Sequence, residues 1–235
     1  MTNQAVLKHF NSIASLYDEY KRRNRIYYQT LMQAVKKQIP NNNCTILDIG
    51  CGTGSILSFL KPHLGIGIDN SSEMIKLAKD KYKHLYNLKF RVHDIEKRPV
   101  SGRFDYILLL DVIEHLQNIN QAMENICKIM NDDTLLIVSM VNPVWEPILI
   151  LMEKLHLKMP EGPHYRIGER QLLTLMRKFG LSLKKRSVYF PEVNLPLVRN
   201  LALIFIYEIK KSRVSRNKFA INDRCHSGER SDSRI

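Results

Sequence analysis

Cysteine is scarce in this sequence, with four in 235 residues. Cys44, Cys51, Cys127 and Cys225 form no C-x-x-C pair, which argues against a zinc ribbon or a dithiol redox motif. The histidines and acidic residues likewise lack the short spacings that define metal ligands, so we expect no metal site. Free thiols in a reducing cytoplasm are the expectation, and the cytoplasm is the expected location.

Long apolar runs are also missing. The longest, near residues 145–152 and 201–207, fall short of the ~20 residues that span a bilayer. Charges such as Lys8 and Asp18 interrupt the N-terminal segment where a signal peptide would have its apolar core. We therefore expect neither a membrane-spanning helix nor a signal peptide.

The sequence also lacks long linkers and has few acidic residues. No long stretch rich in glycine, serine or proline divides the chain, so one domain over residues 1–211 is expected. Asp and Glu number 23 against 36 Lys and Arg, and the resulting net charge of +13 indicates affinity for an anionic partner. Residues 210–235 carry eight Lys or Arg against three Asp or Glu and few apolar side chains. We predict that residues 212–235 form a basic, disordered tail.

Glycine is used sparingly, yet Gly50, Gly52 and Gly54 follow directly on the mainly apolar segment Ile46–Ile49. A strand that runs into such a loop and then into a helix lets the backbone approach a nucleoside closely and directs helix N–H groups at it. Asp69 ends the next apolar run about 20 residues later, where dinucleotide-type folds place an acceptor for ribose hydroxyls. The pattern predicts a nucleoside cradle.

The nicotinamide fingerprint G-x-G-x-x-G/A fits this loop poorly, because Ser55 stands where its third small residue belongs. The segment Leu47-Asp-Ile-Gly-Cys-Gly-Thr-Gly54 instead resembles the first motif of the class I S-adenosylmethionine-dependent methyltransferases. Three further positions extend the resemblance: Asp69, His93-Asp94, and the segment Phe104–Leu116, which reads FDYILLLDVIEHL.

The resemblance covers roughly residues 7–210 and is strongest over residues 44–140. It is closest to methyltransferases of small molecules, in particular those of quinone biosynthesis. It implies S-adenosyl-L-methionine as the cofactor and a seven-stranded sheet with N-terminal helices that cover the cofactor.

Strands and helices alternate along the chain, which predicts an α/β fold with a doubly wound, mainly parallel sheet. Residues 1–40 read as a cover of two helices, and residues 141–167 as an insertion on the substrate side. The expected strands are 46–49, 64–69, 88–93, 104–110, 134–140, 181–190 and 200–210, although the last has a periodicity that a helix would also show. The expected helices after the cover are 55–60, one opened by Ser71 as its N-cap, 117–130, 145–159 and 168–180.

The resemblance also implies a set of cofactor-binding residues. These are Tyr17, Asp48, Gly50, Cys51, Gly52, Gly54, Asp69, Asn70, Met74, Asp94, Ile95 and Leu110. It assigns Asp69 to the ribose, Asp94 to the adenine amine, and Asp48 and Tyr17 to the methionine portion. Each has a simpler alternative: Asp48 caps nearby N–H groups, Tyr17 packs in the core, and Asp69 and Asp94 are solvated loop acids.

The candidate general base is His115, because imidazole titrates near neutral pH and the residue follows the strand that would line the cleft. A capping or packing histidine is the alternative. A base is required only when the acceptor must lose a proton, since the sulfonium cofactor carries an activated methyl group. His164, Tyr165 and Arg166 lie in a loop that could fold over the substrate.

The acceptor is the part that the sequence leaves open. We expect methyl transfer to an O, C or N atom of a small, apolar or lipid-like molecule, reached at a membrane surface. The alternatives are an RNA or protein methyltransferase, which the positive charge favours, and a module that binds the cofactor without turnover. The Asn/Asp-Pro-Pro-aromatic motif of base methyltransferases is replaced by Leu110-Asp-Val-Ile113, so no specific nucleic acid is expected. The oligomeric state is not indicated.

Overall fold

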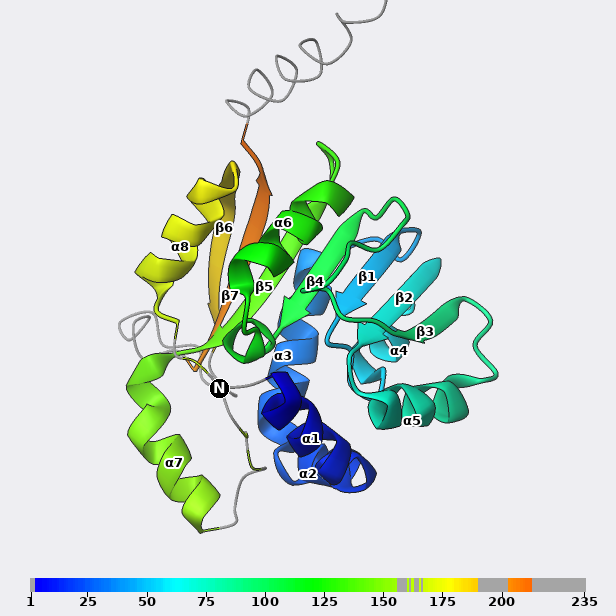
Figure 1. Cartoon of the computed structure of the whole chain (residues 1–235), viewed down its shortest axis with the longest axis vertical. Helices are drawn as coiled ribbons and strands as arrows, with labels where there is room; N and C mark the ends of the chain where they lie inside the picture. The colour runs from blue at the N-terminus through cyan, green and yellow to red at the C-terminus, as the bar shows by residue number, and fades with distance from the viewer. Residues whose placement is uncertain are drawn as a thin grey trace, which may run out of the picture.

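A seven-stranded sheet forms the centre of the computed structural model, which describes residues 3–155, 160, 162, 165, 167–189 and 203–212 (Figure 1). The strand order is β3-β2-β1-β4-β5-β7-β6. The strands are β1 (Thr45–Ile49), β2 (Leu64–Asp69), β3 (Leu88–Val92), β4 (Tyr106–Leu110), β5 (Leu135–Val141), β6 (Leu181–Tyr189) and β7 (Ile204–Lys211). β1 to β5 pair in parallel, and β7 pairs antiparallel with β5 and β6, so the predicted doubly wound, mainly parallel sheet is confirmed.

Helices cover both faces of this sheet. They are α1 (Asn3–Ile13), α2 (Tyr17–Arg23), α3 (Arg25–Gln38), α4 (Ser55–Leu60), α5 (Ser72–Tyr82), α6 (Ile119–Ile129), α7 (Glu146–Lys154) and α8 (Glu169–Lys178), with short 3-10 turns η1 (Ala14–Leu16), η2 (Ile113–His115) and η3 (Pro143–Trp145). α6 and α8 contribute to one buried apolar cluster, and α3, α4 and α5 to the other.

The central strand β4 shows why the sheet is buried on both sides. Ile107 and Leu109 belong to the cluster under α6 and α8, whereas Leu108 and Leu110 belong to the cluster under α3 to α5. Successive side chains of a strand point to opposite faces, so a continuous apolar run suits a strand covered twice. Each such buried side chain contributes about 1.5–3 kcal/mol relative to exposure.

The sheet topology fixes where a ligand site can form. β1 pairs with β2 on one side and with β4 on the other, so the direction of chain progress reverses between β1 and β4. In open parallel sheets, ligands bind beyond the carboxyl ends of the strands at this reversal. The glycine loop, residues 50–54, leaves β1 at that end of the sheet.

The prediction that the N-terminal cover consists of two helices was wrong in detail. The cover, defined here as residues 3–38, contains three helices and η1 rather than two helices, because Asn24 leaves helical geometry with φ −98° and ψ 35°. The closing segment that was ambiguous between strand and helix is the strand β7, paired on both edges. Ser71 caps α5 as predicted, since its side chain accepts a hydrogen bond from Met74 N.

The apolar helix predicted over residues 145–159 begins as η3 and continues as α7 to Lys154. None of the described side chains of α7 is buried. Figure 1 shows α7 beside the sheet rather than stacked on it. Within the described residues, every helix is too short or too polar to cross a membrane. The tail predicted over residues 212–235 lies outside the described part of the chain from residue 213 onward.

Candidate active site

The glycine loop turns sharply because its three glycines adopt positive φ. Gly50, Gly52 and Gly54 have φ of 71°, 52° and 79°. A Cβ on Gly50 would lie 2.4 Å from Cγ2 of Val112, so a side chain at this position has no space. The N–H groups of Gly50 and Cys51 donate to the Ile68 carbonyl at 2.8 and 3.0 Å, which ties the loop to β2. The loop backbone is thus held close to the carboxyl edge of the sheet.

Asp69, at the end of β2, joins two loops. One carboxylate oxygen accepts from the N–H of Gly52 at 2.9 Å, and the other accepts from the N–H of Ser71 at 2.9 Å. Burial raises the pKa of Asp69, and the hydrogen bonds from Ser71 and Gly52 act in the opposite direction. This carboxylate therefore holds the glycine loop against the start of α5.

A cavity of about 820 Å³ opens above these loops, bounded by the cover, α7 and the ends of β1, β2, β4 and β5. It lies within the size range of small-molecule sites and toward its upper end. The structure brings these predicted site residues together in its lining: Tyr17, Asp48, Gly50, Cys51, Gly52, Asp69, Asn70, Met74, Asp94, Ile95, Leu110, His115 and Tyr165.

Three predicted site residues are not found in this lining. Gly54 precedes α4, and a Cβ there would lie 2.6 Å from the ring of Phe90, so it shapes the turn rather than the wall. His164 and Arg166 lie outside the described residues.

Asp48 is the most unusual acid in the cavity. Its side chain is 2% exposed, and Oδ2 has no hydrogen-bond partner within the described part of the chain. Burial raises the pKa of Asp48 to about 7, although the positive charge of Lys21 lowers it. A buried carboxylate oxygen without a donor is costly on its own and suits the cationic part of a ligand.

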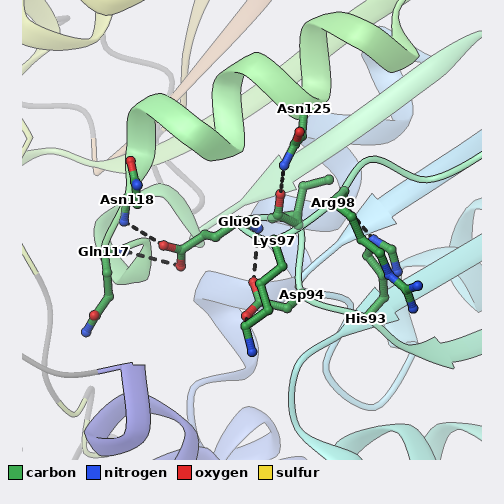
Figure 2. A network of polar contacts seen from close by, with 9 residues as sticks. His93, Asp94, Glu96, Lys97, Arg98, Gln117, Asn118 and Asn125 are labelled. Carbon is green, nitrogen blue, oxygen red and sulfur yellow. Dashed lines mark hydrogen bonds and ion pairs between the residues drawn. The ribbon is translucent and has the colours of Figure 1, made fainter.

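The far wall of the cavity is built by the loop after β3, which a polar network fixes to α6 (Figure 2). Asp94 accepts from the N–H of Glu96 at 3.0 Å. The Glu96 carboxylate accepts from the N–H of Asn118 at 2.5 Å, and the side chain of Asn125 donates to the Ile95 carbonyl at 2.8 Å. Asp94 and Ile95 are therefore rigidly placed and face the cavity.

Asp111 is a site residue that the sequence analysis missed. It follows β4 and has φ 52°, which is rare for a residue with a side chain. Ser139 Oγ donates to one of its oxygens at 2.6 Å, and the Tyr27 hydroxyl donates to the other at 2.7 Å. Asp111 was detectable as the first acid beyond a buried parallel strand, at the edge where ligands bind. Such strained positions are concentrated at functional sites.

His115 and Tyr165 form another part of the lining. The His115 ring packs edge to face against Phe10, with ring centroids 5.2 Å apart. This contact fits the packing alternative, and exposure to the cavity fits the role of a base. Tyr165 is 43% exposed, and its N–H donates to the Glu114 carbonyl at 2.6 Å.

The cover is fastened to the sheet by side-chain hydrogen bonds. Ser71 Oγ donates to Asn11 at 2.5 Å, and Thr53 Oγ1 donates to Asp18 at 2.7 Å. Lys81 forms an ion pair with Asp18 at 2.8 Å. Together with the Tyr27 hydrogen bond, these contacts close the cavity on the side of α1, α2 and α3.

This combination defines a class. A sheet of order 3-2-1-4-5-7-6, with a glycine loop after β1 and an acid at the end of β2, has the Rossmann-like fold of class I S-adenosylmethionine-dependent methyltransferases. The family model of a methyltransferase domain matches residues 18–185, so the chain belongs to this family. S-adenosylmethionine is the cofactor that the family uses.

Curated relatives of this chain are also named as methyltransferases. A juvenile hormone acid O-methyltransferase of Drosophila melanogaster is 36% identical over 119 residues, which cover 45% of this chain and 40% of that protein. A ubiquinone biosynthesis O-methyltransferase of Bartonella tribocorum is 26% identical over 207 residues, covering 77% of this chain and 83% of that protein. The chain aligns with about half the length of several curated relatives, between 40% and 59% of each.

A solved structure shows the same fold. Magnesium protoporphyrin IX methyltransferase from Synechocystis, with bound S-adenosylhomocysteine, superposes with a TM-score of 0.66 at 20% identity, covering 89% of this chain and 99% of that chain. The residues present here also fit the cofactor. The backbone of the glycine loop lines the cavity at Gly50, Cys51 and Gly52, and the unpartnered oxygen of Asp48 suits a cation.

Proposed function

We propose that this chain transfers a methyl group from S-adenosylmethionine to a small apolar acceptor. The cofactor would be held by Asp69 at the ribose, by Asp94 and Ile95 at the adenine, and by Asp48 at the cationic end. The placement of these acids in the cavity lining supports the assignment, since backbone N–H groups fix the carboxylates of Asp69 and Asp94 and Asp48 is buried with one oxygen left to accept a hydrogen bond.

The observation that carries the proposed acceptor is the continuity of the cavity. The same space that touches the glycine loop extends to Trp145, Ile148, Leu149 and Met152 of the η3–α7 segment. Its volume of about 820 Å³ leaves room for a second molecule beside the cofactor. Relatives named for a juvenile hormone acid and for ubiquinone biosynthesis support an apolar acceptor.

The chain's own residues supply orientation and, where needed, a proton acceptor. Bound S-adenosylmethionine supplies a methyl group activated by the sulfonium charge. The residues of the cavity would align the acceptor so that its bond to the methyl group forms as the S–CH₃ bond of the cofactor breaks, and this alignment would contribute most of the catalysis. His115 and Asp111 both face the cavity near Leu110, and either could take the proton that an O–H or N–H acceptor releases.

A membrane surface is the proposed place where the acceptor is reached. α7 exposes Ile150 and Leu151 to 43% and 55%, and Leu155, which follows it, is 57% exposed, on a protein of net charge +13. Exposed apolar side chains on a protein of positive net charge favour an anionic bilayer surface. Sedimentation with phosphatidylglycerol vesicles, compared with phosphatidylcholine vesicles, tests this part. Equal recovery of the protein in the supernatant with both kinds of vesicle would contradict the proposed membrane binding.

The acceptor is tested with methyl-labelled S-adenosylmethionine and a fractionated cell extract. We expect label in a product that partitions into organic solvent and survives nuclease and protease. Label that nuclease or protease releases would identify an RNA or protein methyltransferase instead. Tight cofactor binding without label in any fraction would identify a binding module.

A further inference from the structure

A lysine ammonium lies between two tyrosine rings inside the cavity. Lys21 Nζ is 4.5 Å from the centroid of the Tyr17 ring and 5.0 Å from that of the Tyr28 ring. All three residues line the cavity. Tyr17 and Lys21 share one face of α2 because they are four residues apart, and Tyr28 comes from the neighbouring helix α3. Rings at these distances attract a cation through their π faces.

The Tyr17 ring is close to the glycine loop and to the acids of the cavity. A Cβ on Gly52 would lie 3.1 Å from Cε1 of Tyr17, so this ring covers the loop directly. The charges of Asp69 and Asp111 raise the pKa of Tyr17 beyond the effect of burial, and the charge of Lys21 lowers the pKa of Asp48 and Asp69. The position therefore favours a positive charge from both the rings and the carboxylates.

Lys21 itself forms no hydrogen bond or ion pair within the described part of the chain. The attractions on its ammonium are those of the two rings and of the charges of Asp48 and Asp69. The lysine side chain is long and flexible, and its ammonium is strongly hydrated, so returning it to water costs little. A ligand cation can replace it without breaking a fixed contact.

We propose that Tyr17 and Tyr28 form an aromatic cage for the sulfonium of the cofactor, and that the Lys21 ammonium occupies this cage in the ligand-free protein. This inference rests on the proposed function. Methyl transfer converts the sulfonium to a neutral thioether, so the cage distinguishes the cofactor from S-adenosylhomocysteine by charge. Lys21 then re-enters the cage, and this return favours release of the neutral product.

The first test measures binding by calorimetry with three ligands: S-adenosylmethionine, neutral S-adenosylhomocysteine, and sinefungin, which carries an amine in place of the sulfonium. Tyr28→Leu should weaken the two cationic ligands by about 5- to 30-fold and the neutral one by less than about 2-fold. Tyr28→Phe keeps a ring and should keep the native ratio. Tyr20→Leu is the matched control, since Tyr20 faces Arg23 at 5.8 Å and is not a lining residue.

The second test removes the resident ammonium. Lys21→Met should strengthen binding of the cationic ligands relative to S-adenosylhomocysteine by several-fold, because the cage is then free. Lys37→Met is its control, since Lys37 lies over Tyr189 at 5.8 Å and outside this cavity.

Equal changes for charged and neutral ligands in Tyr28→Leu and Lys21→Met would overturn the cage while leaving the proposed function intact. If the native protein binds none of the three ligands, the proposed function fails, and the cage fails with it. Because Tyr28→Phe retains the ring and its packing, loss of the native charge preference in this variant would also count against the cage.

Discussion

The carboxyl group of Asp48 couples the stability of the fold to pH. Its folded pKa is about 7 against an ordinary value of 3.8, so between these values the folded protein holds a proton that the unfolded chain has released. The contribution of Asp48 to the free energy of unfolding therefore falls as pH rises, by about 1.4 kcal/mol per pH unit at most.

We expect Asp48→Asn to remove this slope. Relative to the native protein, the variant should gain about 2 kcal/mol of stability between pH 5 and pH 7, measured by urea unfolding without cofactor. It should also bind S-adenosylmethionine more weakly, because the carboxylate that suits a cation is gone. Asp80→Asn, exposed on α5, changes the net charge equally and is the control. A stability difference that is the same at both pH values would rule out the titration of Asp48.

Gly52 is the position in the glycine loop where an added side chain would meet the ring of Tyr17. Its φ of 52° costs a residue with a Cβ about 1–2 kcal/mol, and that Cβ would press on the Tyr17 ring. We expect Gly52→Ser to lower the free energy of unfolding by about 1–3 kcal/mol and to weaken binding of S-adenosylhomocysteine.

Gly168→Ser provides the matched control for this substitution. Gly168 has φ −81° at the start of α8, and its nearest neighbour to an added Cβ is 4.0 Å away. Serine is a favoured N-cap, so stability should change by less than about 0.5 kcal/mol. Equal losses in both variants would show that the conformation of Gly52 is not special.

The residues that the sequence analysis located are those encoded by short local patterns. Asp69 stands at the end of an apolar run and the glycines fall at a fixed spacing, whereas Asp48 was assigned from the family resemblance, and the roles of these residues toward the cofactor stay predictions. Tyr27 and Asp111 were missed because their contact is distant in the sequence, and Lys21 was missed because no motif marks a lysine beside two tyrosine rings. The Tyr27–Asp111 hydrogen bond joins residues 84 apart, and no local pattern encodes it.

Among the elements, the cover is attached to the sheet by polar contacts that single substitutions can remove one at a time. Tyr27 donates to Asp111, whose other oxygen is held by Ser139. A hydrogen bond to a charged acceptor contributes about 1.5–3 kcal/mol, so Tyr27→Phe should loosen α3 from the end of β4. We expect faster amide hydrogen exchange over residues 25–38, with little change in β4.

Thr30→Val is the comparison for this experiment, since the Thr30 hydroxyl donates to the Ile26 carbonyl within α3 and has no other hydrogen bond among the described residues. Amide hydrogen exchange over residues 25–38 of Thr30→Val should stay near the native rate, apart from small local effects. Exchange over residues 25–38 that is unaffected by Tyr27→Phe would mean that apolar packing alone holds the cover.

The elements themselves were predictable to different degrees. β1, β2, β4 and β5 are largely buried and apolar, and β3 alternates buried Leu88 and Phe90 with exposed Lys89 and Arg91, so these five strands were recovered from the sequence. The division of the cover into three helices could not be predicted. The break at Asn24 replaces helix with a turn that keeps the same apolar face. β7 was ambiguous because its run of buried residues fits either period, and only pairing with β5 and β6 decides it.

At the scale of the whole molecule, the cavity is assembled from loops of β1, β2, β3 and β4 and from the cover, so a ligand that fills it should stabilise all of them together. A ligand that binds only the folded state at 100 times its Kd adds about 2.7 kcal/mol. For a domain of this size, that raises Tm by about 5–10 °C.

We therefore expect S-adenosylhomocysteine to raise Tm in a thermal scan and to slow hydrogen exchange in both the glycine loop and residues 3–38. NADH at the same concentration is the control, because it carries adenosine but no sulfur-linked methionine portion and requires a different loop spacing. Adenosine recognition alone would give similar shifts with both ligands. A shift with NADH and none with S-adenosylhomocysteine would refute the proposed cofactor site, since the roles of Asp69 and Asp94 would then belong to a pyridine nucleotide.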